Sequence, residues 1–141
     1  MSGPLSGIKI VDLTTVISGP SATMLLADQG ADIIKVESIS APDHARGAGF
    51  GSHHFTSVFL NNNRNKKALA LDLKDPKGKA ALLTVCQDAD VVIQNFRPGV
   101  VERLGVGVVL CGRVGADARV ADRPAVVAAV ALGPPAVQDA E

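Results

Sequence analysis

Two runs of branched apolar residues, separated by one helix-length segment, constrain the fold of this chain most. Residues 8–13 (Ile-Lys-Ile-Val-Asp-Leu) and 32–37 (Asp-Ile-Ile-Lys-Val-Glu) have the composition of buried strands. Residues 22–27 between them are typical of a helix, with Ser18 or Ser21 as its N-cap. A strand, a helix and a strand within about 30 residues predict two parallel strands joined by a right-handed crossover.

The same alternation continues to about residue 107. The pattern predicts further strands at 68–73 and 89–94, helices at 53–60, 76–87 and 98–104, and loops at 38–51 and 61–67. Asp75 and Pro76 are typical of a helix start, and we expect Cys86 to be a small core residue. This order of elements predicts an α/β fold, a Rossmann-like parallel sheet with flanking helices.

The composition changes after residue 107. The 34 residues of 108–141 include 9 Ala, 8 Val, 3 Gly and 3 Pro, and no Lys, Ile, Asn or aromatic residue. Side chains so small and so uniform do not specify one packed core. We therefore expect a domain at 1–107 and an irregular or disordered tail at 108–141, in which 126–132 fits a strand and a short helix equally well. One hypothesis for such a composition is a shifted GC-rich reading frame.

Charge and residue usage argue against several classes of protein. Lys and Arg number 14, as do Asp and Glu, so no surplus of cations is available for wrapping a nucleic acid. The two cysteines, Cys86 and Cys111, form neither a disulfide framework nor a zinc motif, and the three histidines have no carboxylate at a fixed spacing, so we expect no metal site. No signal peptide or membrane-length apolar stretch is visible, and we expect a cytoplasmic protein with no membrane partner.

Candidate binding residues follow from the predicted sheet. Ligands of open parallel sheets bind beyond the carboxyl ends of the strands, which directs attention to residues 14–20, Lys74 and residues 95–98. The turn at 14–20 lacks the Gly-rich dinucleotide motif, and no Walker-type motif occurs. That turn can still offer backbone N–H groups to an anion, although the pattern favours an ordinary strand-to-helix turn.

The segment at 95–98 carries the stronger signal. Phe96 offers a flat apolar surface for a purine ring, and Arg97 offers a guanidinium that pairs with phosphate. Lys74 and Arg103 add positive charge. An equally good explanation is a capped helix start with a core Phe and a solvated Arg. A second basic patch is predicted from Arg64, Lys66 and Lys67.

Several motifs in a fixed order resemble one family. They are Pro4-Leu5-Ser6-Gly7-Ile8-Lys9-Ile10-Val11-Asp12-Leu13, then Gly19-Pro20, Leu26 to Glu37, Asn63-Arg64-Asn65-Lys66-Lys67, Leu71-Asp72-Leu73-Lys74, Gly78-Lys79, Ala89 to Gly99 and Arg103-Leu104-Gly105. Over about residues 4–107 the chain resembles the class III CoA-transferases, the CaiB/BaiF group. That group includes formyl-CoA transferases, carnitine CoA-transferases and α-methylacyl-CoA racemases.

The resemblance implies a CoA-binding Rossmann-like domain that is incomplete relative to the family. It implies CoA or acyl-CoA as a substrate and no permanently bound cofactor. By this resemblance Val16, Ile17 and Ser18 border the thioester end of CoA. The segment from Leu71 to Lys74 lines the adenine pocket, and further CoA contacts are made by Asn95, Phe96, Arg97 and Arg103.

Catalysis in the family resides elsewhere. The transferases use an aspartate that forms acyl anhydrides, and the racemases use a histidine and an aspartate. Asp117, Asp122 and Asp139 lie in no matching motif, so no catalytic residue is assigned in this chain. We expect a class III CoA-transferase that is truncated and inactive alone. The alternatives are a racemase-like protein, a non-catalytic CoA-binding fragment and a poorly folding remnant. Family members form interlocked homodimers through sequence that we do not find here.

Overall fold

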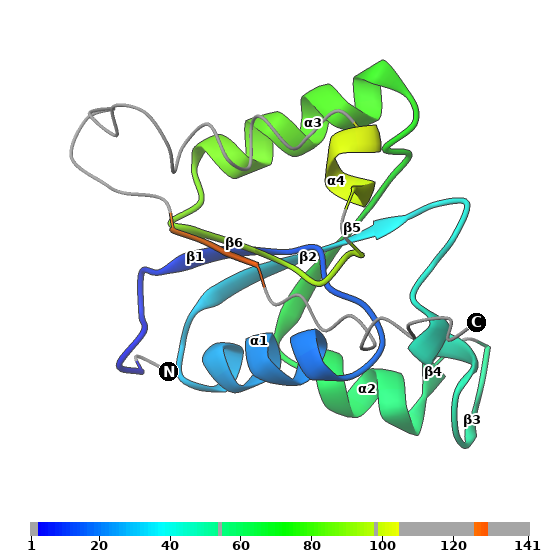
Figure 1. Ribbon diagram of the computed structural model, residues 1–141. Helices are drawn as coiled ribbons and strands as arrows, with labels where there is room; N and C mark the ends of the chain where they lie inside the picture. The colour runs from blue at the N-terminus through cyan, green and yellow to red at the C-terminus, as the bar shows by residue number, and fades with distance from the viewer. Residues whose placement is uncertain (1–2, 54, 98, 105–125, 130–141) are drawn as a thin grey trace, which may run out of the picture.

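A five-stranded parallel sheet forms the centre of the protein. The computed structural model describes residues 3–53, 55–97, 99–104 and 126–129 (Figure 1). The strand order is β5-β2-β1-β6-β7. The strands are β1 (Lys9–Asp12), β2 (Asp32–Ser38), β5 (Lys66–Leu71), β6 (Val91–Gln94) and β7 (Val126–Ala129), and a separate antiparallel ribbon contains β3 (Gly51–Ser52) and β4 (Phe55–Thr56). All neighbouring strands of the large sheet are parallel, which confirms the predicted Rossmann-like architecture.

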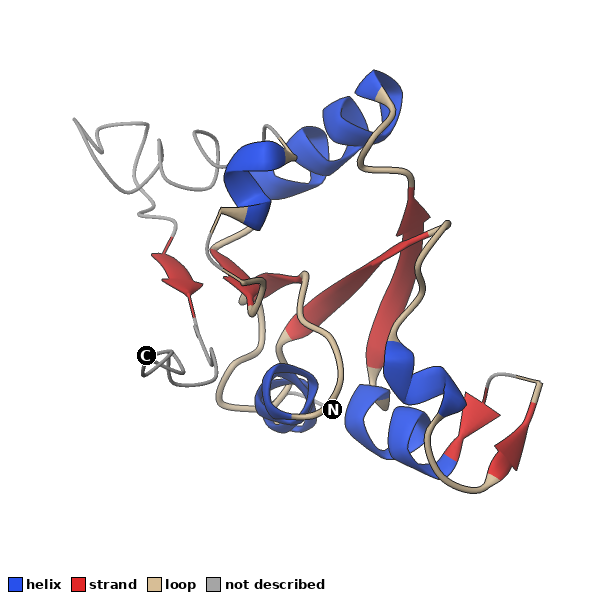
Figure 2. Ribbon diagram, turned by 45° about the vertical axis from the view of Figure 1, so that its right-hand side comes forward, coloured by secondary structure: helices blue, strands red, loops and turns tan. Residues whose placement is uncertain are grey.

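Helices cover both faces of the sheet. One face carries α1 (Ser18–Asp28) and α2 (Ser57–Asn63), and the other carries α3 (Pro76–Gln87) and α4 (Val100–Arg103), as Figures 1 and 2 show. A short 3₁₀ turn, η1 (His44–Gly47), lies in the connection after β2. The carboxyl ends of the strands all point to the same edge of the sheet, because parallel strands share one direction.

Each face of the sheet has its own apolar cluster. Val11, Val36 and Val92 pack with Leu82 and Cys86 of α3. On the opposite face, Ile10, Ile33 and Ile93 pack with Ala27 of α1. Adjacent residues along a strand point to opposite faces, so a strand buried on both sides needs a continuous apolar run. This requirement explains why β1 and β2 were recognisable from sequence.

The helix starts differ in detail from the predictions. Helix α3 begins at Pro76 as predicted, with Asp75 accepting a hydrogen bond of 2.8 Å from the backbone N–H of Lys77. The predicted serine cap of α1 is wrong: Ile17 occupies the N-cap position, and no side chain caps the helix. The predicted helix at 53–60 begins only at Ser57, because Thr56 belongs to β4 and its hydroxyl caps the helix at the N–H of Phe59.

Two other boundaries also moved. The expected polar loop at 61–67 is shorter, since α2 extends to Asn63 and Lys66 already begins β5. Of the tail, the structure describes residues 126–129, which form a strand paired with β6. This outcome selects the strand alternative for that segment. The other residues of 108–141, Cys111 among them, lie outside the described residues.

Candidate functional site

A small pocket opens at the carboxyl edge of the sheet. Its volume is about 120 Å³, and it is lined from β1, β2, β5 and β6 or the turns that follow them. The lining residues are Leu13, Thr15, Val36, Glu37, Ser38, Ala41, Asp43, Asp72, Leu73, Lys74, Phe96 and Leu104. Lys74 and Phe96, which the sequence placed after two different strands, therefore share one hollow.

Local hydrogen bonds fix the two chain segments that carry these residues. The Asp72 carboxylate accepts a bond of 2.9 Å from the backbone N–H of Lys74, which closes the turn after β5. The Gln94 side chain accepts a bond of 2.7 Å from the N–H of Phe96. The half-buried Phe96 ring packs against the apolar cluster under α3, which leaves part of its surface toward the pocket.

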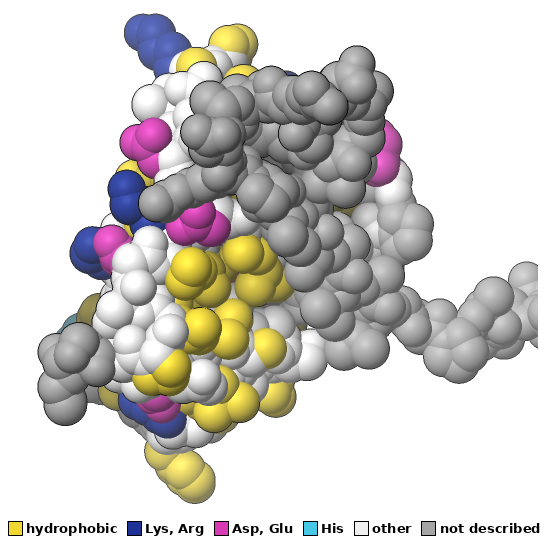
Figure 3. All heavy atoms as spheres, turned by 90° about the vertical axis from the view of Figure 1, so that its left-hand side faces the viewer, with side chains coloured by type: hydrophobic (Ala, Val, Ile, Leu, Met, Phe, Trp, Pro, Cys, Tyr) yellow, Lys and Arg dark blue, Asp and Glu magenta, His cyan; other side chains and the backbone are white. Residues whose placement is uncertain are grey.

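Two other hollows are larger. One, of about 270 Å³, is at the amino ends of β1 and β2, between Lys9, Asp32 and Asp88. Figure 3 views that side of the molecule, where apolar side chains gather on the surface. The other, of about 380 Å³, runs beside β5 at residues 68–70. Open parallel sheets bind ligands at the carboxyl edge, and the smaller hollow is the one lined from the ends of four strands, so it is the better candidate site.

Four other predicted residues are not among those that line the pocket: Leu71, Asn95, Arg97 and Arg103. Asn95 is half-buried and bonds to Thr15. Arg97 is exposed directly after Phe96, and Arg103 is exposed on α4, where its guanidinium lies near Gly99 at the start of that helix. Leu71 points elsewhere: it ends β5 and packs against the apolar cluster under α3.

The turn between β1 and α1 has an unusual backbone. Val16 has a φ of +74°, a region that costs a β-branched residue about 1–3 kcal/mol. Val16 and Ile17 are exposed, as is Ser18. At Gly19 an added Cβ would lie 2.3 Å from the Cβ of Thr14, so only glycine lets α1 start this close to the turn. The turn is therefore tightly held rather than loosely connected.

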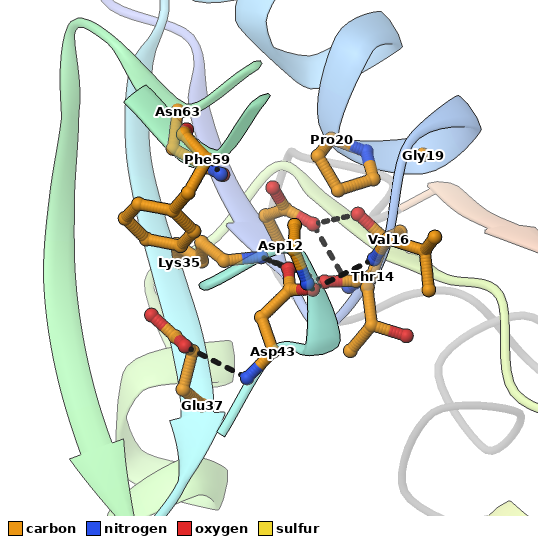
Figure 4. Close-up of polar contacts among 12 residues, drawn as sticks. Asp12, Thr14, Val16, Gly19, Pro20, Lys35, Glu37, Asp43, Phe59 and Asn63 are labelled. Carbon is orange, nitrogen blue, oxygen red and sulfur yellow. Dashed lines mark hydrogen bonds and ion pairs between the residues drawn. The ribbon is translucent and has the colours of Figure 1, made fainter. Parts of the chain in front are cut away.

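Buried charges lie beneath this turn (Figure 4). Asp12 ends β1 and is fully buried, with Lys66 Nζ 3.0 Å from its Oδ2. The hydroxyls of Thr14 and Thr23 also donate to the Asp12 carboxylate. Lys66 Nζ also donates hydrogen bonds to the carbonyl of Pro20 and to the side-chain oxygen of Asn63, at 2.9 Å each. Every donor of this ammonium is thus satisfied, as burial of a charge requires.

A second buried pair lies beside the first. Lys35 is 2% exposed, and its Nζ lies 3.0 Å from Asp43 Oδ2 and donates to the carbonyl of Thr14 at 2.8 Å. Asp12 and Lys35 are also direct cross-strand neighbours in the β1–β2 ladder. Two buried ion pairs therefore lie at the carboxyl edge of the sheet under α1, whereas the rest of that face is apolar.

These contacts shift the ionisation of the site. Burial of Asp12 opposes its ionisation, but attraction to Lys66 and Lys35 and the bonds from Thr14 and Thr23 outweigh it and lower its pKa. Burial also lowers the pKa of Lys66, against the attraction of Asp12. For Glu37, burial is outweighed by the hydrogen bond from Arg46, so the pKa of Glu37 is lowered. Asp12 and Glu37 are therefore carboxylates at neutral pH.

The predicted second basic patch is wrong. Its three cations each pair with a different carboxylate: Arg64 with Asp28, Lys66 with Asp12 and Lys67 with Asp32. Lys66 and Lys67 are consecutive in β5, so their side chains point to opposite faces of the sheet and form no common surface. Only Lys67 and Arg64 are exposed.

The described residues offer no metal site. Within residues 3–53, 55–97, 99–104 and 126–129, no three His, Cys, Asp or Glu side chains are grouped to hold an ion. His44 and His53 are exposed, and Cys86 is buried in the cluster under α3, as predicted for a core residue. Of the helices that the structure describes, none is long and apolar enough to cross a bilayer.

Sequence reasoning missed the contribution of β2 and the loop after it. Glu37 and Ser38 end β2 and line the pocket together with Asp43. Ligands bind beyond the carboxyl ends of parallel strands, and this rule, applied to β2, would have identified Glu37 and Ser38. Lys35 gave another signal, because a lysine inside an apolar strand run needs a buried partner.

Known proteins resemble this chain over most of its length. The family model described as CoA-transferase family III matches residues 5–113. Succinyl-CoA:glutarate CoA-transferase from Homo sapiens is 44% identical over 106 residues, covering 74% of this chain and 24% of that protein. Formyl-CoA:oxalate CoA-transferase from Afipia carboxidovorans is 43% identical over 110 residues, covering 74% and 25%.

A solved structure shows the same fold. The Mycobacterium tuberculosis protein Rv3272 superposes with a TM-score of 0.74 at 35% identity, covering 91% of this chain and 33% of its own. This chain spans about a quarter of the length of the curated relatives that it matches.

Proposed function

The chain belongs to CoA-transferase family III, and from this membership we propose that residues 4–104 bind a CoA thioester, with the nucleotide end of CoA in the pocket between Lys74 and Phe96. The relatives named above are CoA-transferases acting on succinyl-CoA and glutarate or on formyl-CoA and oxalate. Transfer of CoA between carboxylic acids is accordingly the activity that we propose for the whole protein to which this region belongs.

The shared pocket is the observation that carries the proposal. Lys74 follows β5 and Phe96 follows β6, yet both line the same hollow at the carboxyl edge. Ligand pockets that enclose a whole drug-sized molecule have about 300–1,000 Å³. A hollow of about 120 Å³ suits one end of a long carrier, such as a flat base against Phe96. The exposed cations Lys74, Arg97 and Arg103 then supply partners for phosphates outside it.

The thioester end belongs at the turn after β1. Val16 and Ile17 are 45% and 55% exposed, so this turn presents apolar side chains to a ligand on the surface. Thr15 lines the pocket and directly precedes Val16. A carrier with its base at Phe96 passes Thr15 on its way to the turn, which agrees with the order of contacts that the family resemblance implies.

A dinucleotide cofactor fits the same edge less well. In dinucleotide-binding sheets an acidic residue after the second strand receives the ribose hydroxyls. Here Glu37 occupies that place, but Arg46 binds both of its oxygens, at 2.8 and 2.6 Å. The Gly-rich turn is missing as well. These two features favour a CoA carrier over a nicotinamide cofactor.

We assign no nucleophile among the described residues. The two buried carboxylates of the site are paired with ammonium groups: Asp12 with Lys66 and Asp43, which lines the pocket, with Lys35. Incubation of the 141-residue chain with an acyl-CoA is therefore expected to leave its intact mass unchanged. A stable mass increase equal to the acyl group would contradict this assignment.

Calorimetric titration with acetyl-CoA tests the proposed binding. Arg97→Ala removes the exposed charge directly after Phe96 and should weaken binding by about 1.5–3 kcal/mol, roughly 10- to 150-fold. Lys9→Ala is the matched control, because it removes an exposed charge at the amino end of β1. Equal binding by wild type and Arg97→Ala, or equal losses in both variants, would remove Arg97 from the site.

A further inference from the structure

We propose that Asp43 is a positioning residue, whose carboxylate holds the Thr14–Val16 turn against the loop after β2 and so keeps the two walls of the pocket together. The inference rests on the proposed function, since it concerns the same pocket. Asp43 is 2% exposed and lies eight residues beyond Lys35, in the loop that contains η1. Figure 4 shows it beneath Val16 and Thr14.

The two oxygens of the Asp43 carboxylate have different partners. Oδ1 accepts hydrogen bonds from the backbone N–H of Val16 at 2.9 Å and of Ala45 at 3.0 Å. Oδ2 lies 3.0 Å from Lys35 Nζ. One side chain thus joins the β1–α1 turn, the η1 turn and the middle of β2.

The turn is held from both of its ends. Lys35 binds the carbonyl of Thr14 at 2.8 Å, and Asp43 binds the N–H of Val16 at 2.9 Å. Thr15 lies between these two points and lines the pocket. Because Val16 has a φ of +74°, its conformation persists only where the surroundings impose it. The bond to Asp43 is the contact that imposes it from the side of the loop.

The loop itself has other anchors. Arg46 binds Glu37 through two bonds, and its guanidinium carbon lies 3.7 Å from the centre of the Phe59 ring. The backbone N–H of Asp43 also donates to Glu37, at 3.2 Å. These contacts hold the loop on β2 without the Asp43 side chain. The contact that the Asp43 carboxylate adds between the loop and the turn is its hydrogen bond from the N–H of Val16.

A matched pair of double variants tests the acceptor role of Asp43 Oδ1, which serves the N–H groups of Val16 and Ala45, and hydrogen exchange at Val16 reports on the bond to the turn. Lys35→Met with Asp43→Asn removes both charges and keeps an oxygen that accepts from the N–H of Val16. Lys35→Met with Asp43→Ala removes both charges and that acceptor. Neither variant leaves a buried charge unpaired, which is the usual cause of severe destabilisation when one partner of a pair is lost.

Acetyl-CoA affinity and hydrogen exchange at the amide of Val16 are the two readouts. We expect the Asn variant to bind at least tenfold more tightly than the Ala variant and to exchange the Val16 amide at least tenfold more slowly. Adding Val16→Gly to the Ala variant should recover part of the affinity, because glycine adopts a positive φ without strain. Equal affinities in the two variants, or no recovery with glycine, would overturn the proposal.

Two measurements on the wild-type protein also test the proposal. Its Val16 amide should exchange as slowly as the amides inside β1, and fast exchange in the unliganded wild type would overturn the link even if neither variant folds. Absence of acetyl-CoA binding by the wild type would contradict the proposed function instead, while the exchange rates at Val16 would still decide the role of Asp43. The two failures are therefore distinguishable.

Discussion

Asn95 and Thr15 bind each other through two hydrogen bonds across the carboxyl edge of the sheet. The Asn95 side chain accepts from the backbone N–H of Thr15 and donates to its carbonyl, at 2.9 Å in each direction. Asn95 follows β6 and Thr15 follows β1, so the pair continues the ladder between these strands beyond its last backbone contacts. These two bonds fix the position of Thr15, which lines the pocket.

Asn95→Ala is expected to lower the free energy of unfolding by about 1–3 kcal/mol, because it leaves the N–H and carbonyl of Thr15 without their partner. Asn95→Asp keeps the acceptor, but when ionised it places a second carboxylate oxygen against the Thr15 carbonyl, so its cost should decrease at low pH, where the protonated carboxyl regains a donor. Urea denaturation measures both. Asn61→Ala, at an exposed position of α2, serves as the control and should change stability by less than about 0.5 kcal/mol. Equal effects of the Asn95 and Asn61 changes would show that the pair contributes nothing.

Lys66 and Lys67 offer an internal comparison between a buried and an exposed ion pair. Lys66→Met leaves Asp12 buried and without its ammonium, and should destabilise by about 3–5 kcal/mol. Lys67→Met removes an ammonium from an exposed pair, in which the Lys67 side chain is 70% and the Asp32 side chain 44% exposed. It should lower the free energy of unfolding by at most about 1 kcal/mol. Both substitutions are measured by denaturant unfolding.

A result that ranks these two variants the other way would contradict the buried position of the Asp12–Lys66 pair. Restoring stability to Lys66→Met by adding Asp12→Leu would support it, because an apolar pair of similar size can replace a buried ion pair without loss.

Acid sensitivity follows from the lowered pKa values of Asp12 and Glu37. A carboxyl group whose pKa is lower in the folded state stabilises the protein above its unfolded pKa, which is 3.8 for Asp and 4.5 for Glu. That stabilisation is lost as the pH falls through the folded pKa. The free energy of unfolding should therefore decrease as the pH drops below about 4.5.

Glu37→Gln should flatten this decrease, since the partly exposed carboxyl can no longer take up a proton. Denaturant midpoints at pH 3 to 7 for wild type and variant provide the measurement. Parallel curves for the two proteins would show that Glu37 takes no part in the acid response.

The fold was largely predictable because its signals are local. Each buried strand is a short run of branched residues, and α3 begins with Asp75 and Pro76, so the parallel sheet and the strand-end rule could be applied directly. The strand-end rule predicted that Lys74 and Phe96 lie at the same edge of the sheet, and both line one hollow there. It depends only on the common direction of parallel strands.

The supporting structure of the site could not be predicted in the same way. Lys66 pairs with Asp12 across 54 residues, and the direction of a side chain in β5 decides whether its charge is buried or exposed. The sequence predicts this strand to start at residue 68, whereas β5 starts at Lys66. The prediction therefore left Lys66 and Lys67 in a loop, where their alternation between the two faces of the sheet could not be recognised. The positive φ of Val16 has no sequence signal, because a β-branched residue is normally excluded from that conformation.

We propose that the pocket at the carboxyl edge receives the nucleotide end of CoA. The most direct test of this proposal is an NMR titration with adenosine 3′,5′-bisphosphate, which carries that end alone. The largest amide shifts should occur at Thr15, Ser38, Leu73 and Phe96, which line the pocket. Shifts confined to Thr84, Val85 and Asp88, at the larger hollow near the amino ends of β1 and β2, would contradict the account.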